Sequence, residues 1–120
     1  MCRVVVAPDV LSQLRRGALE YCVLGLLSGQ ELYGFDLVKR LGAMEGMVTG
    51  EGTVYPLLSR LQRDGRVSSS WRESSSGGPP RKYYTITPRG QRALAEFTTE
   101  WSRFSRTVDG ILKGIRGELA

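Results

Sequence analysis

Basic and hydroxyl side chains gather in one third of the chain, between Glu51 and Gly90. This segment holds seven basic and three acidic residues, a net charge of +4 in a chain of 120 residues whose net charge is +5. The basic residues are Arg60, Arg63, Arg66, Arg72, Arg81, Lys82 and Arg89. Guanidinium, ammonium and hydroxyl groups bind phosphate oxygens and base edges. The pattern therefore favours a polyanionic partner, and its clustering favours nucleic acid over an anionic membrane surface.

The sequence lacks the usual patterns of catalysis and metal binding. It contains no histidine, which is the commonest general base and a frequent metal ligand. Cys2 and Cys22 have neither metal-ligand nor disulfide spacing. No phosphate-binding loop and no paired carboxylates stand out. We therefore expect no enzyme activity, no metal and no cofactor.

An amphipathic helix over about 53–64 is predicted to enter the major groove. An apolar stripe with i, i+3, i+4, i+7 spacing should face the core; it consists of Val54, Leu57, Leu58 and Leu61. The opposite face should contact DNA and carries Thr53, Tyr55, Pro56, Ser59, Arg60 and Arg63. Taken alone, this face could equally be an ordinary solvated one. Gly65 is expected to end the helix.

The start of this helix is open between two N-cap residues. If Thr53 is the cap, Pro56 takes the third helical position, where its missing N–H has no partner to lose. If Thr49 is the cap, Pro56 lies deep enough to bend the helix.

A basic β-hairpin is predicted after this helix. Side chains alternate over 66–72 and again over 81–87, with a Ser/Gly/Pro tip at 74–80 between the two strands. Gly78 in the tip and Arg81, Lys82 and Tyr83 just beyond it are expected to contact the phosphate backbone or the minor groove. The alternative is an edge hairpin whose charges oppose aggregation.

Other helices must position these elements. Apolar periodicity predicts helices over about 11–27 and 32–41, joined to the third helix by a glycine-rich loop over 42–52. The first ten residues are expected to be a flexible extension. The longest apolar run, Tyr21–Leu27, is far below the roughly 20 residues that span a bilayer, so we expect a soluble, cytoplasmic protein with no membrane partner.

A long C-terminal helix is predicted over 88–120, with Thr87 as N-cap and Pro88 as first helical residue. Its apolar residues alternate in spacings of three and four, which is a heptad seam. The seam consists of Leu94, Phe97, Trp101, Phe104, Val108, Ile111 and Ile115. Such a narrow seam favours pairing with a second copy, so we expect a homodimer through these residues. The alternative is packing against the first helix of the same chain.

Four segments together resemble the PadR family of bacterial transcription regulators. They are 32–37 (LYGFDL), 52–58 (GTVYPLL), Arg60-Leu61 with Asp64-Gly65, and 81–84 (RKYY). The resemblance covers about 14–112. It implies a mostly α fold with a small β-hairpin, in which a winged helix-turn-helix over 11–87 precedes a dimerisation helix over 88–120. It also implies repression by a homodimer at a DNA operator, with Tyr33 among the DNA-binding residues.

The single C-terminal helix resembles the subgroup of this family that has small C-terminal domains. That resemblance implies a planar, hydrophobic small-molecule effector held between the Trp101 side chains of two subunits, with Phe97 and Phe104 as walls. From the residues alone, an aromatic residue in a helical seam is more often core. The extension before Leu14 and the serine-rich wing with two consecutive prolines depart from the family pattern.

We therefore expect a sequence-specific, ligand-responsive repressor that binds a near-palindromic operator with half-sites about one helical turn apart. Two alternatives stay open. The chain could be a winged-helix module for protein–protein interaction. It could also be a protein that senses or buffers a drug-like or planar aromatic molecule.

Overall fold

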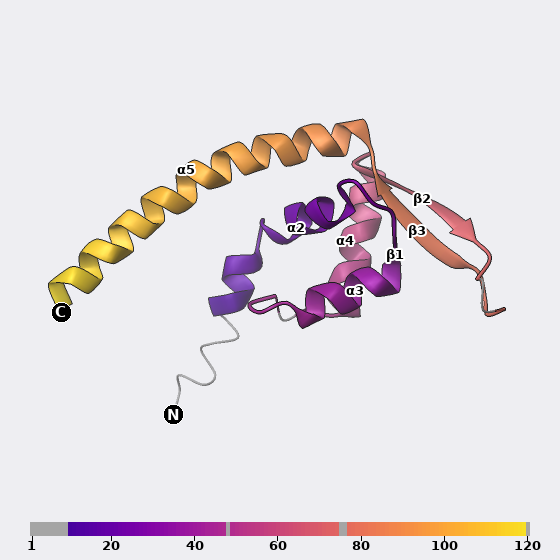
Figure 1. The fold of residues 1–120 in the computed structure, drawn as a ribbon, viewed down its shortest axis with the longest axis horizontal. Coiled ribbons are helices and arrows are strands. Elements are labelled where there is room, and N and C mark those ends of the chain that lie inside the picture. Colours follow the sequence, from indigo (N-terminus) through magenta and orange to yellow (C-terminus); the bar gives the residue numbers. More distant parts are fainter. Residues whose placement is uncertain (1–9, 48, 75–76, 120) are drawn as a thin grey trace, which may run out of the picture.

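The computed structural model describes residues 10–47, 49–74 and 77–119, with side chains through residue 114. The predicted extension over 1–10 lies outside these residues, apart from Val10. The named elements are α2 (Leu19–Leu27), β1 (Leu32–Tyr33), α3 (Gly34–Ala43), α4 (Glu51–Arg63), β2 (Val67–Arg72), β3 (Arg81–Ile86) and α5 (Pro88–Leu119). In Figure 1, α2, α3 and α4 form a compact body, the hairpin of β2 and β3 projects from one side, and α5 extends past the other. This is a winged helix with a long C-terminal helix, as predicted.

One hydrophobic core joins the three helices to the sheet. All four residues of the predicted α4 stripe are buried, and Leu58 and Leu61 are fully so. Leu24 of α2 and Leu37 of α3 are also completely buried. Burying a leucine side chain contributes about 1.5–3 kcal/mol, so this stripe fixes which face of α4 remains outside.

The sheet has three antiparallel strands in the order β1-β3-β2. The two predicted hairpin strands are confirmed to within one residue at each end. Strand β1 was missed: Leu32 and Tyr33, predicted as the first turn of a helix, pair instead with Tyr84 and Tyr83. Helix α3 consequently begins at Gly34, and it ends at Ala43 rather than at residue 41. A strand of two residues is too short to show an alternation of apolar and polar side chains in the sequence. Its conformation depends on pairing with β3.

The single helix predicted over 11–27 is wrong. Residues 10–15 are helical, 16–18 form a turn, and α2 begins only at Leu19. Gly17 has a φ of +81°, in the left-handed region that glycine adopts without steric cost. The chain therefore changes direction at Gly17, and residues 10–15 form a separate helical segment.

Neither predicted N-cap of α4 is correct. The cap is Gly50, with no side-chain hydrogen bond, and the Thr53 and Val54 N–H groups donate to the Gly50 carbonyl at 3.1 and 3.0 Å. The Thr49 hydroxyl is buried without a hydrogen-bond partner. Pro56 is thus the sixth residue of α4, inside the helix, where it leaves the Gly52 carbonyl without its usual intrahelical donor.

The end of α4 is a Schellman turn. Gly65 has a φ of +76°. The Gly65 N–H donates to the Gln62 carbonyl at 3.1 Å, and the Arg66 N–H donates to the Leu61 carbonyl at 2.9 Å. The prediction that α4 ends at Gly65 is therefore confirmed, and β2 begins two residues after Gly65.

Thr87 joins this turn to the start of α5. As predicted, it caps the helix: its hydroxyl oxygen accepts the Gly90 N–H at 3.0 Å. The same hydroxyl donates to the Gly65 carbonyl at 2.6 Å, and the Thr87 N–H donates to the Arg66 carbonyl at 3.0 Å. The first turn of α5 is consequently held against the end of α4.

Candidate nucleic-acid interface

The outer face of α4 carries the residues predicted to contact DNA. Those side chains are exposed except for Tyr55, which is half-buried; the exposed ones are Thr53, Pro56, Ser59, Arg60 and Arg63. Because α4 turns about 100° per residue, Ser59 and Arg63 lie opposite the buried stripe. Tyr55 lies on one flank of this face, and Thr53 and Arg60 lie on the other.

The hairpin covers the Tyr55 flank. A pocket of about 320 Å³ opens between them, and Tyr55, Trp71 and Lys82 are among its lining residues. The Lys82 ammonium lies 5.7 Å from the ring centroids of both Trp71 and Tyr84. Burial and then the negative charge of Glu51 raise the pKa of Tyr55. The Tyr55 hydroxyl therefore keeps its proton and can donate a hydrogen bond to a phosphate oxygen.

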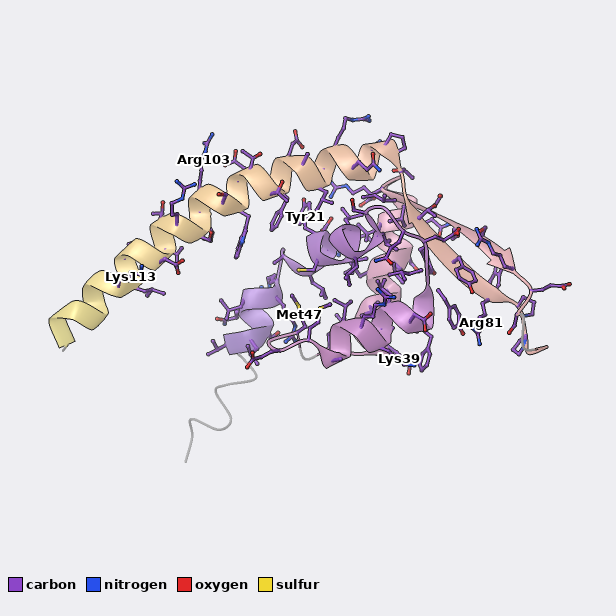
Figure 2. All side chains as sticks on the ribbon, viewed as in Figure 1. Tyr21, Lys39, Met47, Arg81, Arg103 and Lys113 are labelled. Carbon is purple, nitrogen blue, oxygen red and sulfur yellow. The ribbon has the colours of Figure 1, made fainter. Side chains whose placement is uncertain are left out.

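The three basic and aromatic residues after the hairpin tip do not share a face. Lys82 faces the α4 side with Trp71, whereas Arg81 and Tyr83 lie on the opposite side of the sheet. The Arg81 guanidinium lies 4.8 Å from the Tyr33 ring centroid, and the Tyr33 and Tyr83 centroids are 5.9 Å apart. Figure 2 places Arg81 at the hairpin, at the opposite end of the molecule from Lys113 of α5. Tyr33 immediately precedes α3, so this second cluster borders the start of that helix.

Ion pairs engage part of the charge that the sequence assigned to this region. Glu20 of α2 binds Arg60 at 2.9 Å and Arg66 at 2.7 Å. Glu31 forms an ion pair with Arg72. Within the described residues, the basic side chains of 51–90 without an acidic partner are Arg63, Arg81, Lys82 and Arg89. Exposed pairs contribute little to stability, so Arg60, whose side chain is 49% exposed, can exchange Glu20 for a phosphate.

Two further arginines, which the sequence-based prediction did not include, lie beside this face of α4. Arg15 and Arg16 line a pocket of about 380 Å³ together with Thr53, Pro56 and Arg60, on the α4 flank away from the hairpin. A continuous helix was predicted over 11–27, and such a helix gave no reason to place Arg15 and Arg16 beside α4. An arginine pair directly before a glycine was the available signal.

The heptad seam of α5 divides into an inner and an outer part. Leu94 packs against the core, and Phe97 stacks on Tyr21 of α2 with ring centroids 4.2 Å apart and an interplanar angle of 5°. Trp101, Phe104 and Ile111 are 49%, 63% and 60% exposed. The predicted alternative, packing within the chain, therefore holds for the beginning of the seam. Val108 is half-buried, and the side chain of Ile115 lies outside the described residues.

The three predicted ligand-binding residues share one cleft. It has a volume of about 640 Å³ and lies between residues 13–18 and α5. The Phe97 and Trp101 rings are stacked at 5.9 Å and 15°, and Phe104 lies 6.3 Å from Trp101. The cleft is mostly apolar, and Arg16 and Asp109 are the charged residues among those that line it. An extended aromatic surface of this kind suits a flat apolar molecule or a second helix.

The described residues form neither a membrane-spanning helix nor a cluster of metal ligands. None of the helices there has the length and hydrophobicity needed to cross a bilayer. No group of three or more His, Cys, Asp or Glu side chains is placed to hold a metal ion in that part of the chain. Burial raises the pKa of the Cys22 thiol, which disfavours the reactive thiolate.

Known proteins are similar to this chain in sequence and in fold. The sequence pattern of the Transcriptional regulator PadR-like family matches residues 23–96. The transcriptional regulator Rv3488 of Mycobacterium tuberculosis is 31% identical over 100 residues, which are 83% of this chain and 91% of that protein.

Solved structures of PadR proteins are similar to this chain in fold. A PadR-like transcriptional regulator from Bacillus cereus has a TM-score of 0.75 at 39% identity, over 83% of this chain and 96% of that one. A PadR family regulator from Eggerthella lenta has a TM-score of 0.76 at 34% identity, over 93% of this chain and 96% of that one. The family consists of transcriptional regulators rather than enzymes. With more than half of its length matched by the family pattern, the chain belongs to the PadR family of DNA-binding, winged-helix transcriptional regulators.

Proposed function

We propose that this regulator represses transcription as a homodimer that inserts α4 of each subunit into the DNA major groove. One observation carries the proposal: α4 buries its whole apolar stripe and turns its hydroxyl and guanidinium groups outward, beside Lys82 of the hairpin. An α-helix fits the major groove, where such groups bind base edges and phosphates. The hairpin then lies over the backbone or the neighbouring minor groove.

The exposed part of the α5 seam supports the dimer. Trp101, Phe104 and Ile111 are large, apolar and about half or more exposed, although they follow one heptad seam. A homodimer formed through this seam would hold two α4 helices at a fixed spacing. We therefore infer a near-palindromic operator with half-sites about one helical turn apart.

The hairpin contact is tested by the double variant Arg81→Ala/Lys82→Ala. We expect at least a tenfold loss of affinity, similar for the DNA upstream of the gene and for mixed-sequence DNA, because phosphate contacts carry no sequence information. The slope of log K against log salt should fall by about 2 to 4 as phosphate contacts are lost from both subunits. Gel shifts at several salt concentrations, with competitor DNA, measure both quantities.

The matched control is Arg106→Ala/Lys113→Ala, which removes the same charge from the side of α5 opposite the seam. It should leave the salt slope unchanged. Equal affinity and slope for the hairpin variant and the wild type would remove the hairpin from the interface. Absence of any shift by the wild-type protein would instead favour a winged-helix module for protein–protein contacts. The single variants Arg81→Ala and Lys82→Ala then show which face of the hairpin contributes.

A second proposed function is capture of a planar, hydrophobic effector in the aromatic cleft on α5. The stacked rings of Phe97 and Trp101 support it, since a flat molecule can extend the same stack. Asp109, which is among the lining residues, favours a planar cation. In a dimer, the same rings from the second subunit can close the other side of the ligand.

Trp101→Ala tests this effector site. A planar cationic dye should quench Trp101 fluorescence saturably in a Trp71→Phe background, which removes the other tryptophan. Trp101→Ala should weaken dye binding about tenfold, as measured by calorimetry, because one stacked aromatic contact per subunit is lost. Undiminished dye binding by Trp101→Ala would exclude the cleft as the binding site.

A further inference from the structure

We propose that Arg15 and Arg16 bind the DNA phosphate backbone on the flank of α4 that faces away from the hairpin. This basic surface, which we call the N-terminal wall, consists of Ser12, Arg15 and Arg16. The proposal rests on the DNA-binding function above, because α4 must enter the groove for the wall to reach phosphate. The wall lies outside residues 23–96, the part of the chain that matches the family pattern.

The wall and the hairpin lie on opposite flanks of α4. Tyr55 faces the hairpin pocket that contains Lys82, whereas Thr53 and Arg60 face the pocket that contains Arg15 and Arg16. The major groove is about 12 Å wide and is bordered by one phosphate strand on each side. With α4 in the groove, the hairpin reaches one border and the N-terminal wall reaches the other.

The fold holds the wall in this place. The left-handed Gly17 separates the helical segment 10–15 from α2 and turns it toward α4. The Arg16 N–H donates to the carbonyls of Ser12 and Gln13 at 3.2 Å each, which closes the end of this segment. Leu19, which is 8% exposed, anchors the following turn in the core and lines the same pocket.

The chemistry of the pocket suits a phosphodiester. Three arginines are among the residues that line it, Arg15, Arg16 and Arg60, together with the hydroxyl-bearing residues Ser12 and Thr53. No carboxylate is among the lining residues. Across the part of the chain that is described, neither Arg15 nor Arg16 has an ion-pair partner, since Glu20 is already bound to Arg60 and Arg66. Arg15 and Arg16 are thus available to bind an anion, and duplex DNA is the anion that α4 would bring to this flank.

The test compares two double variants with the wild type in the same gel-shift and salt series. Arg15→Ala/Arg16→Ala should bind both upstream and mixed-sequence duplexes about tenfold more weakly, with a salt slope lower by about 2, one phosphate contact per subunit. Arg15→Lys/Arg16→Lys keeps the charge and should restore most of the affinity and the slope. Arg106→Ala/Lys113→Ala again controls for net charge. Because Arg16 also borders the cleft on α5, sedimentation checks that each variant has the wild-type mass.

The outcomes separate this inference from the function on which it rests. A wild-type protein that binds no DNA overturns the proposed function. If the wild-type protein binds DNA and the alanine variant binds it with equal affinity and salt slope, only the proposed DNA contact of the N-terminal wall is overturned. Equal weakening by the alanine and lysine variants also overturns it, because the arginines would then act through packing rather than through charge.

Discussion

Gly90→Ala is expected to lower the free energy of unfolding by about 2–3 kcal/mol, the cost of overpacking a closely packed site. A Cβ atom at Gly90 would lie 2.1 Å from the Arg66 carbonyl oxygen and 2.8 Å from Cγ1 of Ile86. The oxygen is backbone and already accepts the Thr87 N–H at 3.0 Å, so it cannot move without loss of that bond. The substitution therefore pushes the first turn of α5 away from the end of α4.

Gly110→Ala is the matched control. Both glycines lie inside α5, but a Cβ atom at Gly110 meets nothing within 4 Å. Alanine there should stabilise the helix by about 0.5–1 kcal/mol, since glycine is the poorer helix former. Urea unfolding followed by circular dichroism, at one fixed protein concentration, measures both changes. Equal stability of Gly90→Ala and wild type would show that α5 is not fixed to the winged helix at this contact.

Much of this fold could be predicted from the spacing of residue types along short segments of the chain. The α4 stripe, the glycine stop at residue 65, the alternation of the hairpin strands and the Thr87 cap each depend on residues within one turn or one strand of each other. The structure confirms all four, because local spacing determines which side chains can share a face. What local spacing could not supply was the partner of each element. Strand β1 exists because Leu32 and Tyr33 find Tyr84 and Tyr83, about 50 residues later in the chain.

The elements that form the candidate interface could be predicted from the sequence, but the ion pairs of its basic residues could not. Alternation along β3 already separated Lys82 from Arg81 and Tyr83, yet their adjacency in sequence grouped them as one contact. Counting charge could not show that Glu20 and Glu31, both outside the basic segment, bind three of its arginines. Nor could it place Arg15 and Arg16 beside α4, since that depends on the backbone turn at Gly17.

Phe104→Glu is expected to convert the proposed dimer into a monomer and to reduce operator affinity by about 10²–10⁴-fold, because the second half-site is then no longer bound within one molecule. Phe104 lies between Trp101 and Val108 on the seam and is 63% exposed in the single chain. In the dimer, each introduced carboxylate would be removed from water beside apolar side chains and near its symmetry mate. Both the desolvation and the like-charge repulsion oppose association.

The fold of the subunit should survive this change, which makes the result interpretable. Among the described residues, Phe104 belongs neither to the buried core nor to the side chains packed against it, and its ring centroid lies 6.3 Å from that of Trp101. Thr99→Glu adds the same charge to α5 on the side opposite the seam and should remain dimeric, with unaltered operator affinity. Sedimentation equilibrium and gel shifts on one set of samples measure mass and affinity together. A Phe104→Glu protein that stays dimeric would place the subunit contact elsewhere and would leave the exposed aromatic seam to the effector alone.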